Sequence, residues 1–188
     1  ESWSFGRGED GVLGHGGTAN EWVPRLIEAL NLMVVKQVAA GGDHSMVLTR
    51  DGDVFTWGSG YLGQLGHGNH GQQRVPKRVE GLTNVTDIAA GNSHSLAVVE
   101  AGSVYTWGYN NTGQLGLGDH GGDTNRNVPT EVPGVNGMVA VAAGSTHSFA
   151  LSRDGTVMAC GYNNEGQLGL GDTDNRDTFT VRRHLSSN

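Results

Sequence analysis

Residues 57–68 read WGSGYLGQLGHG, and this stretch decides the fold because it returns along the chain. Residues 107–118 read WGYNNTGQLGLG, and residues 160–171 read CGYNNEGQLGLG. A more divergent copy, FGRGEDGVLGHG, occupies residues 5–16. The second residue of each copy is a glycine, at positions 6, 58, 108 and 161, so successive copies are separated by 52, 50 and 53 residues. Such a regular step is the sequence signature of a repeat architecture.

A second block keeps the same step as the first. It reads AAGGDHS at residues 39–45, AAGNSHS at residues 89–95 and AAGSTHS at residues 142–148. Two blocks in phase indicate one structural unit copied along the chain. We expect a single domain over residues 1–188, built from an incomplete unit at 1–35 and full units at 36–85, 86–136 and 137–188.

The signals within each unit are those of short strands. Residues 44–49 and 54–57 are rich in apolar and β-branched side chains, and they flank an Asp-Gly pair that suits a tight hairpin turn. Further strands are expected around residues 38–40 and after each proline, as at residues 77–79. The segment 25–30 is expected to be such a strand rather than a helix.

These strands predict an all-β fold, a β-propeller arc. Two strands of the first unit and four in each of three full units give 14 strands, or about 3.5 blades. The run Met46-Val47-Leu48 is apolar on both faces of its strand, as expected for a sheet packed between two neighbouring sheets.

Composition and charge exclude several classes of protein. Glycine accounts for 32 of the 188 residues but does not recur at every third position, which excludes collagen. The single cysteine, Cys160, cannot form an internal disulfide, and no apolar run is long enough to span a bilayer. A net charge of −7 argues against binding to the phosphate backbone of a nucleic acid. We therefore expect an intracellular protein that binds neither nucleic acid nor a membrane.

The combined pattern resembles the repeat of the regulator of chromosome condensation family. It consists of Gly-x-x-His-Ser, a hairpin ending in aromatic-x-Trp-Gly, and Gly-Gln-Leu-Gly-x-Gly. Residues 58–68 and 108–118 match it closely, and the resemblance covers nearly the whole chain. Departures lie toward the ends, where Phe5 and Cys160 replace the tryptophan and Phe179 falls where the proline is expected.

The resemblance implies a seven-bladed ring, of which this chain forms part. An open arc exposes two apolar sheet faces to water, so some other segment must cover them. The remaining blades come either from the same longer chain or from a second copy, since two sets of 14 strands make the 28 of a seven-bladed ring.

The resemblance also implies a non-catalytic scaffold that presents propeller loops to protein partners. The alternative is a guanine-nucleotide exchange factor for a small GTPase, an activity that in the family involves acidic loops and a wedge-like insertion. The connections at residues 69–76 and 119–129 leave no room for such a wedge, which favours the scaffold. The plant ultraviolet-B photoreceptor that shares the repeat carries Gly-Trp-Arg-His in several blades. The positions of its tryptophan and arginine are occupied here by Gly42-Asp43, Asn92-Ser93 and Ser145-Thr146, so we do not expect photoreception by that mechanism.

Motifs that suggest catalysis, a cofactor or a metal each fail on a physical requirement. Residues 58–63 spell a dinucleotide fingerprint, but the glycine-rich sequence that follows cannot form the helix that would hold a pyrophosphate. His44, His94 and His147 lie one per unit, whereas nucleophilic catalysis needs one asymmetric site, so we expect each to bond backbone within its own blade. The acidic stretch 172–177 lacks the glycine and glutamate of a calcium loop. We therefore predict no catalytic, cofactor-binding or metal-binding residues.

The candidate partner-binding residues are those that differ between equivalent loop positions and offer a charge or an amide. In the two long connections they are His70, Gln72, Gln73, Arg74, Asp119, His120, Asp123, Asn125 and Arg126. The short turns add Asp43, Asn92 and Ser145, which we expect on the opposite face of the propeller.

Overall fold

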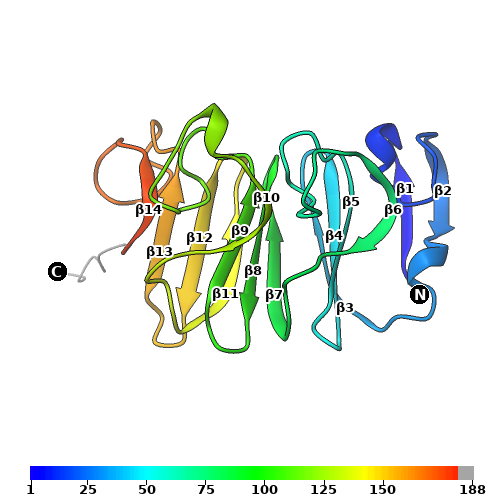
Figure 1. Ribbon diagram of the computed structural model, residues 1–188, viewed down its shortest axis with the longest axis horizontal. Coiled ribbons are helices and arrows are strands. Elements are labelled where there is room, and N and C mark those ends of the chain that lie inside the picture. The colour runs from blue at the N-terminus through cyan, green and yellow to red at the C-terminus, as the bar shows by residue number, and fades with distance from the viewer. Residues whose placement is uncertain (182–188) are drawn as a thin grey trace.

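The computed structural model describes residues 1–181, which form an arc of four antiparallel sheets standing side by side (Figure 1). The first sheet has two strands, β1 (Trp3–Gly6) and β2 (Glu21–Leu26). The second contains β3 (Val35–Ala40), β4 (His44–Thr49), β5 (Val54–Gly58) and β6 (Gln73–Arg78). The third contains β7 (Val85–Ala90), β8 (His94–Val99), β9 (Val104–Gly108) and β10 (Arg126–Glu131). The fourth contains β11 (Met138–Ala143), β12 (His147–Ser152), β13 (Val157–Gly161) and β14 (Arg176–Val181).

The predicted all-β arc of about 3.5 blades is confirmed. Each full sheet is a meander whose strands pair in chain order. Helical structure in the described residues is confined to three short 3₁₀ turns, η1 (Glu9–Gly11), η2 (Glu28–Leu30) and η3 (Gly122–Thr124). The expected end of the last unit, residue 188, lies outside the described residues.

The outermost strands differ from the prediction in where they begin. Pro24, Pro76 and Pro129 lie inside β2, β6 and β10 rather than before them. Proline lacks a backbone N–H, and the outermost strand of each sheet has one unpaired edge that needs no donor. The segment predicted as a strand over 25–30 is divided, because β2 ends at Leu26 and η2 then turns the chain.

The core lies between neighbouring sheets rather than on one side of them. One cluster joins Met46, Leu48 and Val54 of the second sheet to Ile88 and Trp107 of the third. Strands β4 and β8, which lie between two neighbouring sheets, are therefore buried on both faces, as predicted for β4.

The first sheet is the outer half of a blade. β1 pairs with β2 in the register in which β5 pairs with β6, and Gly6 occupies the place of Gly58. The two inner strands that β3 and β4 supply in the second sheet have no counterpart among the described residues of the first. A second copy would bring another outer half, so the half-blades of two copies do not complete one another.

A main-chain carbonyl joins each blade to the next, and we call this arrangement the carbonyl latch. The Gln64 carbonyl accepts one hydrogen bond from Ser95 Oγ at 2.8 Å and another from Trp107 Nε1 at 2.9 Å, both from the following blade. In the same way the Val12 carbonyl accepts from Ser45 and Trp57, and the Gln114 carbonyl accepts from Ser148 and Cys160. The latch explains the recurrence of serine and tryptophan at these positions.

Two of the three repeated histidines, His44 and His94, bond to the next blade, which corrects for these two the prediction that each bonds backbone in its own blade. His44 Nε2 lies 2.9 Å from Ser95 Oγ, and His94 Nε2 lies 3.0 Å from Ser148 Oγ. Because each serine hydroxyl donates to the latch carbonyl, it accepts from the histidine, whose proton therefore sits on Nε2. Burial lowers the pKa of His44 to about 4; burial and the neighbouring histidines lower that of His94 to about 3.

These pKa shifts predict acid sensitivity. Between pH 6.5 and 5 the histidines of the unfolded chain gain protons that buried His44 and His94 do not, so the free energy of unfolding falls as the pH falls. Each histidine contributes up to ~1.4 kcal/mol per pH unit in this window. Urea unfolding at a series of pH values measures the slope.

The substitution His94→Gln should flatten this dependence, because it removes one titrating group. The substitution Asn111→Gln changes an exposed residue that does not titrate; it is the control and should leave the slope unchanged. An unaltered slope in His94→Gln would show that another group carries the effect.

Candidate functional site

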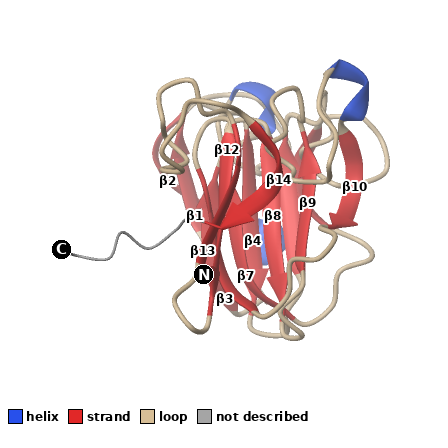
Figure 2. Cartoon of the chain, turned by 90° about the vertical axis from the view of Figure 1, so that its left-hand side faces the viewer, coloured by secondary structure: helices blue, strands red, loops and turns tan. Residues whose placement is uncertain are grey.

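The long connections of the chain gather at one end of the sheets. Residues 7–20, 59–72, 109–125 and 162–175 join the two outer strands of successive blades at this end. We call this end the loop face; the opposite, hairpin face carries the tight turns at 50–53, 100–103 and 153–156. Figure 2 shows the strands running between the two ends, with the larger loops at the top.

Each of the first three long loops lies on the outer strand of the next blade. Gly16 N–H donates to the Arg74 carbonyl, Gly68 N–H to the Asn127 carbonyl and Gly118 N–H to the Asp177 carbonyl, each at 2.8 Å. Gly66 has a positive φ of 75°, and a Cβ there would come within 2.9 Å of Trp107 Nε1. The loops are thus fixed by the neighbouring blade, and their polar side chains have defined positions.

A buried asparagine organises the third loop. Asn110 is fully buried; its side chain accepts from Leu115 N–H and donates to Asp119 and Thr124. Asn125 Oδ1 accepts from the Asn110 N–H at 2.9 Å, and Arg126 forms an ion pair with Asp119. Three of the predicted partner-binding residues, Asp119, Asn125 and Arg126, therefore also hold their own loop together.

The fourth loop repeats this network around Asn163. Its amide donates to Asp172 Oδ1 and to the Asp174 carbonyl, and Asn175 Oδ1 accepts from the Asn163 N–H at 2.7 Å. Arg176 forms an ion pair with Asp172 at 2.6 Å. In the stretch that begins like a calcium loop, the first carboxylate is therefore paired with an arginine of the same stretch. Across residues 1–181 no group of three or more His, Cys, Asp or Glu side chains is placed to hold a metal.

Other predicted residues link adjacent loops. Gln72 Nε2 donates to Asp10 Oδ1 at 2.9 Å and so bridges the second blade to the first. Arg74 Nε donates to Gln72 Oε1 at 2.9 Å. His120 Nδ1 lies 3.3 Å from Asp177 Oδ2 and bridges the third blade to the fourth.

Asp43, Asn92 and Ser145 lie on the loop face, which corrects their predicted place on the opposite face. The Asp43 carbonyl accepts from Ser59 N–H at 2.8 Å, and Ser59 begins a long loop. The cause is strand register: His44 pairs with Gly58, so the turn before β4 and the loop after β5 share one end.

The loop face therefore collects all twelve predicted partner-binding residues. Seven of them are exposed: Asp43, His70, Arg74, Asn92, His120, Asp123 and Ser145. Asn110 and Asn163 are not among the predicted residues. Both begin the pattern Asn-Asn-x-Gly-Gln-Leu-Gly-x-Gly-Asp, which is followed by Asn-Arg, and this shared pattern is a signal that could have found them.

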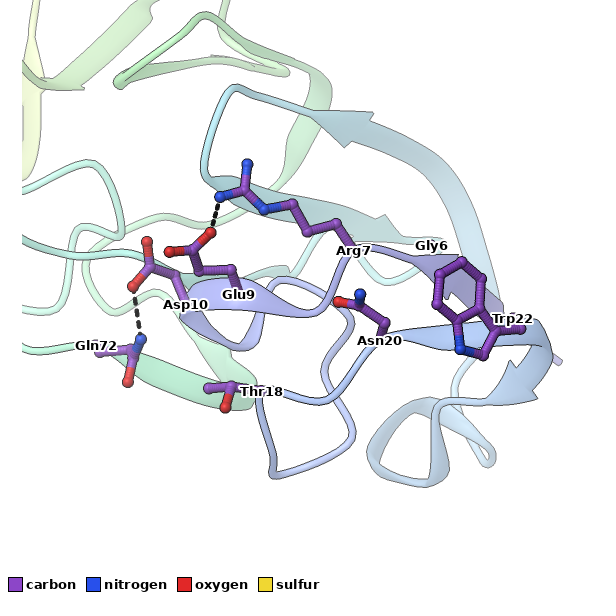
Figure 3. Close-up of a pocket in the computed structure, with 8 residues that line it drawn as sticks. All are labelled: Gly6, Arg7, Glu9, Asp10, Thr18, Asn20, Trp22 and Gln72. Atoms are coloured by element: carbon purple, nitrogen blue, oxygen red, sulfur yellow. Dashed lines mark hydrogen bonds and ion pairs between the residues drawn. The ribbon is translucent and has the colours of Figure 1, made fainter.

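One hollow on this face was not predicted from the sequence. A cleft of about 650 Å³ opens beside the first sheet, lined by Gly6, Arg7, Glu9, Asp10, Thr18, Asn20, Trp22 and Gln72 (Figure 3). Trp22 is 88% exposed, and Arg7 pairs with Glu9 across the rim. Nothing in the repeat pattern marks this cleft, because most of its lining comes from the most divergent copy of the loop.

Three buried groups of the described chain, His44, His94 and Cys160, are held in their uncharged forms. His44 and His94 are neutral and enclosed, and burial raises the pKa of the Cys160 thiol well above its usual value. No helix among residues 1–181 has both the length and the apolar character that crossing a bilayer demands.

A family model described as the RCC1-like domain matches residues 1–187. The chain belongs to the RCC1-like domain family. Human E3 ubiquitin-protein ligase HERC2 is 39% identical over 178 residues, which are 93% of this chain and 4% of HERC2. The Ultraviolet-B receptor UVR8 of Arabidopsis thaliana is 39% identical over 174 residues, which are 91% of this chain and 39% of UVR8. These matches confirm the resemblance seen in the repeats.

A solved structure supports the same assignment. Prp20p from Saccharomyces cerevisiae superposes with a TM-score of 0.83 at 26% identity, over 97% of this chain and 46% of that chain. This RCC1-like domain chain thus spans less than half the length of each of these three proteins.

The buried network of this RCC1-like domain chain predicts the effect of removing Asn110. The substitution Asn110→Ala leaves the Leu115 N–H without its partner in a buried site, which costs ~1–3 kcal/mol. We expect a matching loss in the free energy of urea unfolding and faster exchange of the Leu115 amide. The adjacent Asn111 is exposed, so Asn111→Ala should change stability by less than ~0.5 kcal/mol. Equal effects of the two substitutions would contradict this assignment.

Proposed function

We propose that the chain is a non-catalytic interaction module whose loop face binds a protein partner that carries basic residues. Support comes from the distribution of charge. The carboxylates of the loop face are Glu9, Asp10, Glu21, Asp43, Asp119, Asp123, Glu165, Asp172, Asp174 and Asp177. Its guanidinium groups are fewer, namely Arg7, Arg74, Arg126 and Arg176.

Ion pairs within the loops leave still fewer guanidinium groups to balance the carboxylates of the loop face. Arg7, Arg126 and Arg176 already pair with carboxylates of their own loops. Asp43 and Asp123 are exposed and make no ion pair among the described residues. The observation that carries the proposal is thus an acidic, fixed and polar surface, which steers and orients a positively charged partner.

The comparisons support binding as the general role. The crystal structure of Prp20p was described together with its binding properties to Gsp1p and histones. HERC2 is named an E3 ubiquitin-protein ligase, but this chain matches only 4% of it, so we assign no ligase activity here. We further propose that the partner is met inside the cell, where a single unpaired cysteine is common.

Selective neutralisation of the loop face tests the proposal. The variant Asp43→Asn/Asp123→Asn/Asp174→Asn removes three exposed carboxylates there. The control Glu28→Gln/Asp51→Asn/Glu100→Gln makes the same change in net charge on exposed residues of the hairpin face. Proteins captured by the wild type and the control but lost from the loop-face variant are purified, and their affinities are measured by calorimetry.

We expect the loop-face variant to bind such a partner about tenfold more weakly at low salt, chiefly through slower association. The difference should shrink as the salt concentration rises, because exposed charges are screened. Equal loss in the two variants would show only an effect of net charge, and loss in the control alone would place the binding site on the hairpin face.

The exchange-factor alternative rests on the family resemblance, and the loops of this chain do not favour it. The segments at 69–76 and 119–129 contain the first residues of β6 and β10, and otherwise only the 3₁₀ turn η3. We therefore predict that the chain does not accelerate nucleotide release from a panel of small GTPases loaded with fluorescent GDP. Catalytic acceleration for any one of them would establish the alternative.

A further inference from the structure

Residues 136–137 form the only Asn-Gly pair in the sequence, and both are exposed on the hairpin face. Met138 follows directly and begins β11; its N–H donates to the Gly102 carbonyl in the hairpin turn of the preceding blade at 3.0 Å. A bond of the same kind joins the second blade to the third, where Val85 N–H donates to the Gly52 carbonyl at 3.2 Å. We call this arrangement the hairpin joint, and the Asn-Gly pair lies in the joint between the third and fourth blades.

The residue before the strand has a left-handed backbone in both joints. Gly137 has a φ of 73°, and Asn84 holds the equivalent position with a φ of 53°. Glycine adopts this conformation without strain, which accounts for its presence at position 137. The joint of the second and third blades has Thr83-Asn84 where that of the third and fourth has Asn136-Gly137. The backbone geometry of the joint thus leaves Asn136 next to a residue without a Cβ.

An asparagine side chain that precedes glycine is open to attack by the glycine nitrogen. The Gly137 nitrogen bonds to Asn136 Cγ, the bond from Cγ to the side-chain nitrogen breaks, and that nitrogen leaves as ammonia with the proton that Gly137 gives up. A cyclic succinimide results. Water then opens the ring at either of its two carbonyls, which yields aspartate or isoaspartate. In isoaspartate the main chain runs through Cβ and Cγ, so it is longer by one carbon atom.

Three features of the joint leave this reaction unhindered. Among residues 1–181, no hydrogen bond holds the Gly137 N–H or the Asn136 side chain. Both residues are exposed, so water reaches them. A Cβ on Gly137 would meet nothing within 4 Å, which leaves room for the ring. By contrast, the exposed Asn111 precedes Thr112, whose N–H is held by Gln114 Oε1 at 3.0 Å.

We propose that Asn136 is a site of spontaneous deamidation in the folded chain, and that its isoaspartate form loosens the hairpin joint between the third and fourth blades. Isoaspartate lengthens the main chain directly before Met138, which is 6% exposed and belongs to the core between these blades. The joint has no slack on the side of Gly102, since a Cβ there would lie 2.8 Å from Gly137 Cα. The aspartate form keeps the normal main chain and leaves the joint intact.

This site is separate from the acidic loop face, and its test does not depend on a binding partner. The chain is incubated at mildly alkaline pH and then mapped by proteolysis and mass spectrometry. Conversion raises the mass of the fragment that contains Asn136 by one unit, and a protease that cleaves before aspartate but not before isoaspartate distinguishes the products. A synthetic peptide of residues 132–141 reports the reactivity of the pair without the joint. The variant Asn136→Thr/Gly137→Asn copies the other joint and is the matched control.

We expect Asn136 to convert to both products in the folded chain, and faster as the pH rises, because the attacking nitrogen must lose its proton. Asn111 should stay intact over the same period, and the matched control should show no conversion in this segment. Amide exchange by NMR reports on the joint. The isoaspartate form should lose the protection of the Met138 amide, whereas the substitution Asn136→Asp, which reproduces the other product, should retain it.

Three results would overturn the proposal. An absence of conversion in the folded chain would show that Asn136 is not such a site, and the peptide would then show whether the fold or the local sequence prevents the reaction. Conversion of Asn111 as fast as that of Asn136 would show that the joint does not select the site. Equal protection of the Met138 amide in the isoaspartate form and in Asn136→Asp would show that the joint is not loosened.

Discussion

The carbonyl latch is the interaction on which the rest of the structure depends. A carbonyl such as that of Gln64 turns toward the next blade and accepts from a serine and a tryptophan there. The bond requires the glycine-rich loop around it to adopt one path, and that path sets the loop on the neighbouring outer strand. Sheets that would otherwise only stack through apolar contacts are thereby fixed in register, and the loop face acquires a defined shape.

Much of the fold could be predicted because the repeat and the hairpin turns are local signals. The two blocks in phase, together with turns such as Asp51-Gly52, predicted the strands of β4 and β5 closely. The partners of His44 could not be predicted, since its bond to Ser95 depends on how sheets stack and not on periodicity along the chain. The prolines were misplaced for a related reason: whether a strand tolerates proline depends on which of its edges is free.

The functional residues were predicted with the same mixture of success and failure. Loop variability selected residues that the fold does bring to one end, but it could not separate side chains that hold a loop, such as Asn125, from those that face solvent, such as Asp123. It also placed Asp43 on the wrong face, because only strand pairing shows that the short turns and the long loops share an end. The side chains common to the units hold blades together, and the side chains that vary give the loop face its acidic character.

Hydrogen–deuterium exchange of the isolated chain tests most directly whether neighbouring blades hold each sheet in place. The account predicts the slowest exchange in β8 and β9, which have a complete sheet or a latch on both sides, and the fastest in β1 and β2, which have a neighbour on one side only. Equal protection of β1 and β9 would contradict it, because each sheet would then be stable without the latch.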